Sequence, residues 1–532
     1  MTTLQNSDSK TNHLAQLERR RLELQAELDA GKSQAERNRL GQFATPPALA
    51  QEILAATKRP MGREPVRFLD PAFGTGAFYY ALLSCFPRER IVVAEGYEID
   101  PYYGTPARHL WQQTSLVLHL ADFTKAHPPA SESERFNLVV CNPPYVRHHH
   151  LSGADKERLR KACQQASGIS ADGLSGLYCY FLVLSHEWLA DGGLGVWLLP
   201  SEFMDVKYGS WVKRYLTEKV TLLGIHRFDP NEVQFGDALV SSAVVFFRKR
   251  LPSAGHEVAF TFGGTLGKPR LEGMIPLAIL RREKKWTRFP VRAERTSAGY
   301  VLGDFFVIKR GLATGDNSYF ILTTERVHEL HLPKRFLTPI LPGPRHLKGD
   351  EILADENGNP LTEPQLFLLD CKLPEDRVRE AHPTLWRYFE EGKARGTTAR
   401  YLCQHRSPWY AQEQRLPAPF LSNYMGRSDN GTRAPFRFIR NRSKATAANV
   451  YLLMFPKGML LSALQSRPEL ADRIWAALKR LKPRTLVEEG RVYGGGLHKL
   501  EPKELANVPA DEIAQILGLP QKNAGYQLEL LG

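Results

Sequence analysis

The fold is decided by the stretch Val66-Arg67-Phe68-Leu69-Asp70-Pro71-Ala72-Phe73-Gly74-Thr75-Gly76, in which a short apolar run leads directly into a glycine-rich turn. The run has the length of a buried strand, and a helix is predicted after the turn, from about Phe78 to Cys85. Gly74 and Gly76 carry no Cβ atom, so the backbone can approach a ligand closely. The third glycine of the dinucleotide fingerprint is missing, which argues against NAD or FAD. The stretch therefore predicts an α/β sheet with a ligand at its edge.

Polar side chains follow the next three predicted strands. Strands are expected at 91–97, at about 116–120 and at 136–140, and they end in Glu98, Asp122 and Asn142. An acid after the second strand is placed to accept hydrogen bonds from a ribose diol. Asp122, with Phe123 beside it, can bind the amino edge and the face of an adenine. Each acid could instead cap a surface turn.

The fourth strand leads into Cys141-Asn142-Pro143-Pro144-Tyr145. Such a loop could hold an amide, a fixed backbone turn and an aromatic ring over one planar substrate. The alternative is a Pro-Pro turn with no function beyond ending the strand. This loop follows the carboxyl end of a predicted strand, as the glycine-rich turn, Glu98 and Asp122 do. Because ligands of doubly wound sheets bind at the carboxyl ends of the strands, this shared position favours the functional interpretation.

Further apolar runs complete the predicted sheet. A helix is expected at 177–188, a fifth strand at 193–200, and a closing strand pair at 220–228 and 239–247. This alternation predicts an α/β fold with a doubly wound, mostly parallel, seven-stranded sheet. We expect an N-terminal helical extension (1–40), this sheet domain (41–252), a connector rich in Pro, Gly and charge (253–299) and a mixed α+β domain (300–532).

Two features precede the sheet domain. Residues 13–38 predict an amphipathic helix whose leucine face is interrupted by Arg21. Docking on the body of the protein is the simplest interpretation, and a dimer arm or a clamp on a nucleic-acid backbone remains open. Gly41-Gln42-Phe43-Ala44-Thr45-Pro46-Pro47 then gives a helix start signal, with proline in the first turn.

Charge and composition limit the possible partners. The chain of 532 residues has a net charge of +14 and a pI near 9.4, which suits a partner that carries phosphates. Residues 401–450 hold eight Arg or Lys against two acids, interleaved with aromatic residues, a profile typical of a nucleic-acid face. A solvated surface is the alternative. No run approaches 18 apolar residues, so no membrane span is expected.

The cysteine and histidine patterns predict no metal. The six cysteines lie far apart without a CxxC pair, which argues against a zinc ribbon or a disulfide framework. His148-His149-His150 are adjacent, whereas zinc sites prefer spaced ligands. Next to Arg147, a contact with a DNA backbone is the preferred interpretation of these histidines.

Taken together, Gly41–Pro46, Asp70–Gly76, Glu98, Asp122 and Asn142–Tyr145 resemble, in their order, the gamma class of DNA adenine-N6 methyltransferases of type II restriction-modification systems. The resemblance covers about residues 40–250. It continues through Gly311-Leu312-Ala313-Thr314-Gly315-Asp316-Asn317 and the Gly-Gly-Leu-His-Lys-Leu segment at 495–500. It implies a Rossmann-like domain dependent on S-adenosyl-L-methionine (AdoMet), followed by a target recognition domain. The asparagine at the first catalytic position fits adenine modifiers.

Site residues are implied by position. Around the methionine part of AdoMet we expect Thr45, Asp70, Pro71, Ala72, Gly74 and Gly76. Glu98 is expected at the ribose hydroxyls, and Asp122 with Phe123 at the adenine of AdoMet. The methyl-transfer site is expected at Asn142, Pro143, Pro144 and Tyr145. Tyr145 and Phe235 are expected to sandwich the flipped target base, with Phe228 as a competitor for the second position.

The resemblance also implies the partners. We expect double-stranded DNA, bound by Arg147, Arg433, Arg437, Arg440, Arg442 and Lys444. A companion restriction endonuclease, a bacterial cytoplasmic location, no metal and no covalent intermediate are implied as well. Methylation of RNA or of a protein glutamine amide is the alternative. A fused nuclease and a decayed, non-catalytic site are the remaining readings, which the short N-terminal region and the intact motifs disfavour.

Overall fold

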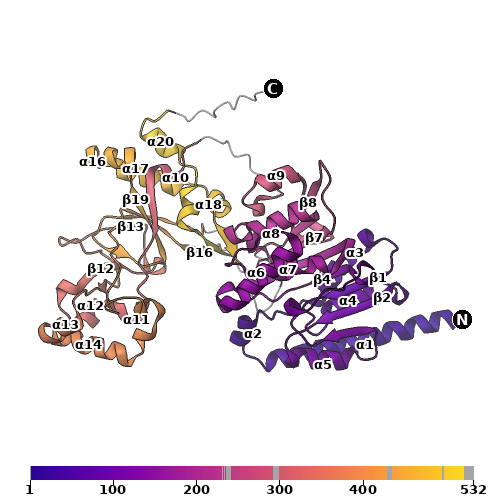
Figure 1. Ribbon diagram of the computed structural model, residues 1–532. Helices are drawn as coiled ribbons and strands as arrows, with labels where there is room; N and C mark the ends of the chain where they lie inside the picture. Colours follow the sequence, from indigo (N-terminus) through magenta and orange to yellow (C-terminus); the bar gives the residue numbers. More distant parts are fainter. Residues whose placement is uncertain are drawn as a thin grey trace. The chain divides into compact units, whose positions relative to one another are not determined.

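The computed structural model describes residues 2–230, 232, 234, 241–290, 299–427, 434–493 and 496–520. Phe235 and Arg433 lie outside these residues. The chain divides into two compact units: Met1–Glu294 with Tyr493–Gly495, and Arg295–Val492 with Gly496–Gly532. Figure 1 shows both along the colour gradient, the first from indigo to magenta and the second from orange to yellow.

A large sheet forms the centre of the first unit (Figure 1). Its strand order is β3-β2-β1-β4-β5-β7-β6-β8-β9, and the five strands from β3 to β5 are all parallel. β7 then runs antiparallel to both β5 and β6. The α/β class and the mainly parallel sheet are therefore as expected. The strands are β1 Val66–Asp70, β2 Ile91–Tyr97, β3 Leu116–His119, β4 Phe136–Cys141, β5 Leu189–Pro200, β6 Thr221–Arg227, β7 Ser242–Arg248, β8 Glu257–Thr265 and β9 Lys268–Pro276.

The expected connector at 253–299 and the expected strand count of seven are wrong. β8 pairs in parallel with β6, and β9 pairs antiparallel with β8, so the sheet has nine strands. Val258 and Phe260 are at most 1% exposed, and they alternate along β8 with less buried residues. The Pro, Gly and charged residues around this short alternation concealed the strand signal, because β9 is the edge strand, β8 is its neighbour, and both keep polar side chains toward solvent.

The helices of the first unit pack around this sheet. Among them α3 packs against α4, α6 against α7, and the long N-terminal α1 against α4 and α5. The docked interpretation of the N-terminal helix is thus the one the structure shows. The helices are α1 Thr2–Ala30, α2 Gln34–Leu40, α3 Pro47–Met61, α4 Ala77–Cys85, α5 Pro101–Trp111, α6 Gly153–Ser167, α7 Leu177–Leu184, α8 Ser210–Arg214 and α9 Leu277–Arg282.

Three small sheets with surrounding helices form the second unit, the expected mixed α+β fold. Their strand orders are β10-β19-β15-β17-β13, β11-β14-β12-β18 and β16-β21-β20. The strands are β10 Phe306–Arg310, β11 Ile321–Thr323, β12 Leu337–Leu341, β13 Glu351–Ile352, β14 Leu366–Leu369, β15 Phe420–Asn423, β16 Met425–Arg427, β17 Phe438–Asn441, β18 Thr446–Ala447, β19 Tyr451–Pro456, β20 Arg491–Tyr493 and β21 Leu497–Lys499. The helices are α10 Leu302–Phe305, α11 Asn317–Phe320, α12 Thr324–Glu329, α13 Glu375–Ala381, α14 Pro383–Ala394, α15 Tyr401–Gln404, α16 Gly458–Ser466, α17 Leu470–Arg480, α18 Pro483–Glu489, α19 Pro502–Ala506 and α20 Asp511–Ile516.

Hydrophobic cores support each unit separately. One continuous cluster of buried side chains fills the first unit, and three smaller clusters lie in the second. Within the described part of the chain, no helix combines the length and the apolar character that a bilayer crossing requires.

Candidate active site

The ends of four parallel strands meet at one edge of the large sheet. Asp70 at the end of β1 pairs with Gly96 of β2, and Tyr97 pairs with His119 of β3. On the other side, Leu69 pairs with Val139 of β4. This register brings the loops that follow the four strands to the same edge. The four predicted strand-end residues, Asp70, Glu98, Asp122 and Asn142, are thus gathered at one edge.

The glycine-rich turn is held by the acid after β2. Gly74 has a φ of +56°, and its backbone N–H donates to Glu98 Oε2 at 2.9 Å. The other oxygen, Oε1, accepts from the Asp100 N–H at 2.8 Å. A Cβ atom built on Gly74 would meet nothing within 4 Å, whereas one built on Gly76 would lie 2.6 Å from Trp111 Nε1. Gly74 therefore faces open space, and Gly76 is required for internal packing.

Asp70 is a buried acid at the end of β1. Its side chain is almost fully buried, with a relative exposure of 1%. Burial, with the negative charge of Glu98 nearby, raises the pKa of Asp70 to about 8, although the N–H of Ala72 donates to it and acts in the opposite direction. Burial likewise raises the pKa of Glu98. The edge therefore holds two acids in surroundings that disfavour their charged forms.

Asp122 and Phe123 differ in how far their side chains are exposed. Asp122 Oδ1 accepts from the backbone N–H of Thr124 at 2.9 Å and from its hydroxyl at 2.7 Å, which fixes the turn after β3. The Phe123 ring is 3% exposed and packs against Tyr97, Phe181 and Trp188. Asp122 is thus partly open to a ligand, whereas Phe123 mainly belongs to the core beneath it.

The nitrogen and the oxygen of the Asn142 amide differ in their hydrogen bonding. Its Nδ2 donates to the Phe43 carbonyl oxygen at 3.0 Å and to Thr45 Oγ1 at 3.1 Å. A carbonyl can only accept, so this contact fixes the orientation of the amide. Asn142 Oδ1 is buried and has no hydrogen-bond partner among the described residues. Since a buried acceptor without a donor is unfavourable, this atom marks a position for a donor from outside the chain.

The Gly41–Thr45 segment braces the loop that carries Asn142. Tyr145 N–H donates to the Gly41 carbonyl at 3.2 Å, and the Phe43 and Tyr145 ring centroids are 5.8 Å apart. A Cβ atom on Gly41 would lie 2.3 Å from Tyr145 N, and the φ of Gly41 is +66°. The hydroxyl of Thr45 contacts the Asn142 amide, and the place of Thr45 at the methionine part of AdoMet stays a prediction.

Tyr145 is anchored by its hydroxyl. The hydroxyl donates to the Leu198 carbonyl at 3.2 Å, and the ring makes an edge contact with Tyr178, at a centroid distance of 6.3 Å. The residue is 9% exposed, and burial raises the pKa of its hydroxyl. Pro143 is buried and Pro144 half-buried, so the loop is a rigid part of the core edge.

The N-terminal helix reaches the glycine-rich turn, a contact that the sequence did not predict. Arg21 is 1% exposed, pairs with Glu18 at 2.7 Å and donates to Thr75 Oγ1 at 3.2 Å. The Thr75 hydroxyl in turn donates to Gln25 Oε1 at 2.7 Å. In the sequence, this contact was indicated only by an arginine within an apolar helix face. Such an arginine is as compatible with a buried ion pair as with a simple interruption of the apolar face.

The cations predicted to bind DNA are mostly paired within the chain. Arg437 bonds to Asp350 at 2.7 Å, and Arg442 bonds to Glu351 at 2.7 Å and Asp472 at 2.8 Å. Arg440 donates to the Pro419 carbonyl and stacks on the ring of Phe420. Arg147 is exposed, and Lys444 Nζ lies 3.4 Å from the Asn357 carbonyl. Three of these arginines therefore hold the fold of the second unit together, and their contact with DNA stays a prediction.

Most of the aromatic residues at 401–450 are buried. Tyr410, Phe420, Tyr424, Phe436 and Phe438 are all at most 4% exposed. They belong to the cores of the second unit, so the prediction of an aromatic nucleic-acid face at 401–450 is wrong for these rings. Among the described residues, no three His, Cys, Asp or Glu side chains are grouped so that they could hold a metal ion.

Comparisons with known proteins place this geometry in context. The model of the Eco57I restriction-modification methylase family matches residues 105–234, and that of the C-terminal domain of type II methyltransferase M.Eco57I matches residues 284–524. Type II methyltransferase M.XamI of Xanthomonas campestris pv. amaranthicola is 27% identical over 453 residues, 83% of this chain and 80% of that protein. M.AccI of Acinetobacter calcoaceticus is 24% identical over 489 residues, 88% of this chain and 85% of that protein.

One solved structure supports the fold over both units. The type IIL restriction-modification enzyme MmeI, solved in complex with DNA, matches with a TM-score of 0.52 at 11% identity. The match covers 88% of this chain and 70% of that one.

Proposed function

Because the chain belongs to the type II restriction-modification methyltransferases, we propose that it methylates N6 of an adenine in a specific duplex DNA sequence, with AdoMet as the methyl donor. The methylated site is thereby protected from a cognate restriction endonuclease. An adenine inside a duplex cannot reach a loop at a sheet edge, so the base is flipped out of the stack.

The buried Oδ1 atom of Asn142 carries this proposal. It is an acceptor without a partner among the described residues, at the end of β4. An exocyclic amine offers the N–H donor that this atom lacks. Such an amine is a poor nucleophile because its lone pair is delocalised into the ring. Hydrogen bonds to Asn142 Oδ1 and to the Pro143 carbonyl favour an sp³-like nitrogen with its lone pair directed at the methyl group.

Neighbouring residues keep the acceptor in position. The Phe43 carbonyl and the Thr45 hydroxyl hold Asn142 Nδ2, so Oδ1 does not rotate away when the substrate enters. Tyr145, fixed by its bond to Leu198, offers a ring on which the flipped base stacks, worth roughly 1–3 kcal/mol. The loop thus supplies orientation, and no strong base is required.

The other strand ends fit a nucleoside-containing methyl donor. AdoMet, when bound, supplies an electrophilic methyl group on a positively charged sulfur. Gly74 leaves open space beside the turn, and Glu98 has lone pairs beyond the two that accept backbone N–H groups. Glu98 is therefore assigned to the ribose hydroxyls and Asp122 to the adenine. A cationic ligand here would also relieve the repulsion between Asp70 and Glu98.

The proposal is tested with tritiated AdoMet offered to duplex DNA, RNA and protein, followed by nucleoside analysis for N6-methyladenine. Asn142→Ala should lower kcat by about 10²- to 10³-fold, as the loss of one preorganised hydrogen bond at a reacting atom does. AdoMet affinity, measured by calorimetry, should stay unchanged. Transfer only to RNA or to a glutamine amide of a protein would overturn the DNA substrate.

Thr45 gives a finer version of the same test. Thr45→Val removes the hydroxyl that holds Asn142 Nδ2 and should lower kcat roughly fivefold to tenfold. Thr45→Ser keeps the hydroxyl and should retain most of the rate. A loss of AdoMet affinity in Thr45→Val, with kcat intact, would instead place Thr45 at the methionine part of AdoMet.

A further inference from the structure

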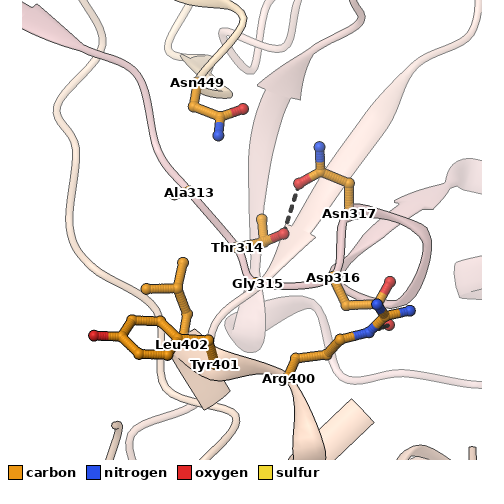
Figure 2. A pocket seen from close by; sticks show the side chains of 9 residues that line it. All are labelled: Ala313, Thr314, Gly315, Asp316, Asn317, Arg400, Tyr401, Leu402 and Asn449. Carbon is orange, nitrogen blue, oxygen red and sulfur yellow. Dashed lines mark hydrogen bonds and ion pairs between the residues drawn. The ribbon is translucent and has the colours of Figure 1, made fainter. Parts of the chain in front are cut away.

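The second unit contains a polar hollow of about 460 Å³ that the proposed catalysis does not use. Figure 2 shows the side chains around it, which come from the loop before α11, from the start of α15 and from the turn before β19. The hollow is open, since Tyr401 is 72% exposed and the Arg400 side chain 65%. An open hollow cannot enclose most of a small ligand, so a large partner is the better fit. Its lining is Ala313, Thr314, Gly315, Asp316, Asn317, Arg400, Tyr401, Leu402 and Asn449.

Cations outnumber acids around this hollow. Arg406 donates to the Ala313 and Thr314 carbonyls at 2.7 and 2.6 Å, and Arg395 donates to Ser318 at 3.3 Å. Arg400 lies 3.9 Å from Asp316, the single acid in the lining. The Asp316 carboxylate also accepts from Ser318 and Thr397. In contrast to Arg437 and Arg442, the arginines here leave a local excess of positive charge.

Two carboxamide side chains face the hollow with hydrogen-bonding groups that a partner could use (Figure 2). The Thr314 hydroxyl donates to Asn317 Oδ1 at 2.6 Å, which leaves both N–H groups of the Asn317 amide for a partner. The side chain of Asn449 has no hydrogen bond within the described ranges, although its backbone is held by Leu312 and Arg310. Carboxamides on a fixed backbone are the groups that read base edges, and Asn reads adenine bidentately.

The loop is rigid enough to position these amides. Gly315 has a φ of +93°, and a Cβ atom there would lie 3.1 Å from Cys403 Sγ, so the turn packs closely on α15. The two bonds from Arg406 fix the preceding carbonyls. A preorganised loop loses little entropy when a partner binds.

We propose that this hollow is a DNA-reading site of the second unit. Asn317 and Asn449 contact a base edge, for which an adenine is the best match, and Arg400 with Arg395 contacts the phosphates. This assignment rests on the proposed DNA substrate and adds the residues that determine specificity.

The phosphate contact is tested by the salt dependence of binding to a fluorescein-labelled random-sequence duplex. Arg400→Ala should reduce the slope of log K against log salt by about 0.9, the value for one lost phosphate contact, and Arg400→Lys should keep the slope. Arg377→Ala, on α13 outside the lining and 71% exposed, is the matched control and should leave the slope unchanged. Equal slopes for Arg400→Ala and the wild type would overturn the phosphate contact.

The base contact is tested by mapping N6-methyladenine on a plasmid library with randomised inserts. Asn449→Ala and Asn317→Ala should each weaken discrimination at a base position by roughly ten- to hundredfold, while AdoMet affinity and thermal stability stay at wild-type values. An unchanged methylated sequence in both variants would overturn the reading site and leave the proposed function standing. No methylation or binding of DNA by the wild type would overturn the proposed function itself.

Discussion

Asp70 places a carboxyl group in the core. An apolar or amide side chain at this position would make the folded protein more stable. It is 1% exposed and shares its edge with Glu98, and these surroundings raise its pKa to about 8. Stabilities of single domains are small, so an unfavourable buried acid is kept where function requires it. At this sheet edge we expect the requirement to be a ligand that carries positive charge.

A pH-dependent stability difference is therefore expected for Asp70→Asn. Between pH 3.8 and about 8 the folded protein holds a proton that the unfolded chain releases, so the free energy of unfolding falls as the pH rises. Asparagine has no such proton, and its oxygen can still accept from Ala72. The melting temperature of Asp70→Asn should thus exceed that of the wild type by an amount that grows from pH 4 to pH 8, about 2–4 °C for each kcal/mol in a domain of 150–250 residues.

Thermal melts of both proteins without ligand check this expectation. Asp376→Asn, at an exposed position of α13, serves as the control and should show no pH-dependent gain. A constant difference across the pH range would show that Asp70 is ionised in the folded protein over the whole range.

At the scale of elements, the segment before α3 and the loop after β4 act as one piece. Two hydrogen bonds from Asn142 and one from Tyr145 join them, and Gly41 lies against the Tyr145 backbone. The sequence predicted β1, β2 and β4 closely, because each is a short and mostly apolar run. It could not predict which side chains of the two segments would meet, since that depends on how distant parts of the chain approach. Arg21, which interrupts a leucine face, pairs with Glu18 of the same helix, but its contact with Thr75 depends on the docking of the helix and could not be predicted.

Gly41→Ala tests this bracing. The new methyl group would lie 2.3 Å from Tyr145 N, and backbone atoms of the loop would have to shift. A displacement of about 1 Å at a reacting group lowers turnover roughly 10²-fold, so we expect a loss of this order in methyl transfer. Gly168→Ala is the matched control: Gly168 also caps a helix with a left-handed φ, of +71°, and its nearest neighbour is the mobile end of Lys219 at 3.4 Å.

Both variants carry the strain of a left-handed alanine, about 1–2 kcal/mol. Gly41→Ala adds the cost of moving the loop backbone, so its melting temperature should fall further than that of Gly168→Ala. Methyl transfer should fall in Gly41→Ala alone. Equal rates in the two variants would mean that the contact between Gly41 and Tyr145 has no part in positioning the loop.

Over the whole molecule, we expect the two units to divide the work. The first gathers the strand-end acids and Asn142, and the second carries the open hollow, where the Asn449 side chain has no hydrogen bond to any described residue. Charge counting along the sequence pointed to residues 437–444, because cations cluster there. It could not reveal that Asp350, Glu351 and Asp472, distant in sequence, neutralise Arg437 and Arg442. Around the 313–317 loop the cations Arg395, Arg400 and Arg406 come from one stretch of the chain, but that stretch is distant in sequence from the loop, so their shared position could not be predicted.

Hydrogen–deuterium exchange on the full chain tests this division. A ligand that binds the folded state protects the amides whose opening it opposes. AdoMet alone should slow exchange in peptides that contain 70–76, 98–100 and 122–124, and should leave 313–317 and 400–402 unchanged. Adding duplex DNA should slow exchange at 313–317, 400–402 and 142–145. Peptides at 437–444, whose arginines are held by acids of the same unit, should change little, and protection there without protection at 313–317 would return the DNA contact to the basic segment that the sequence indicated.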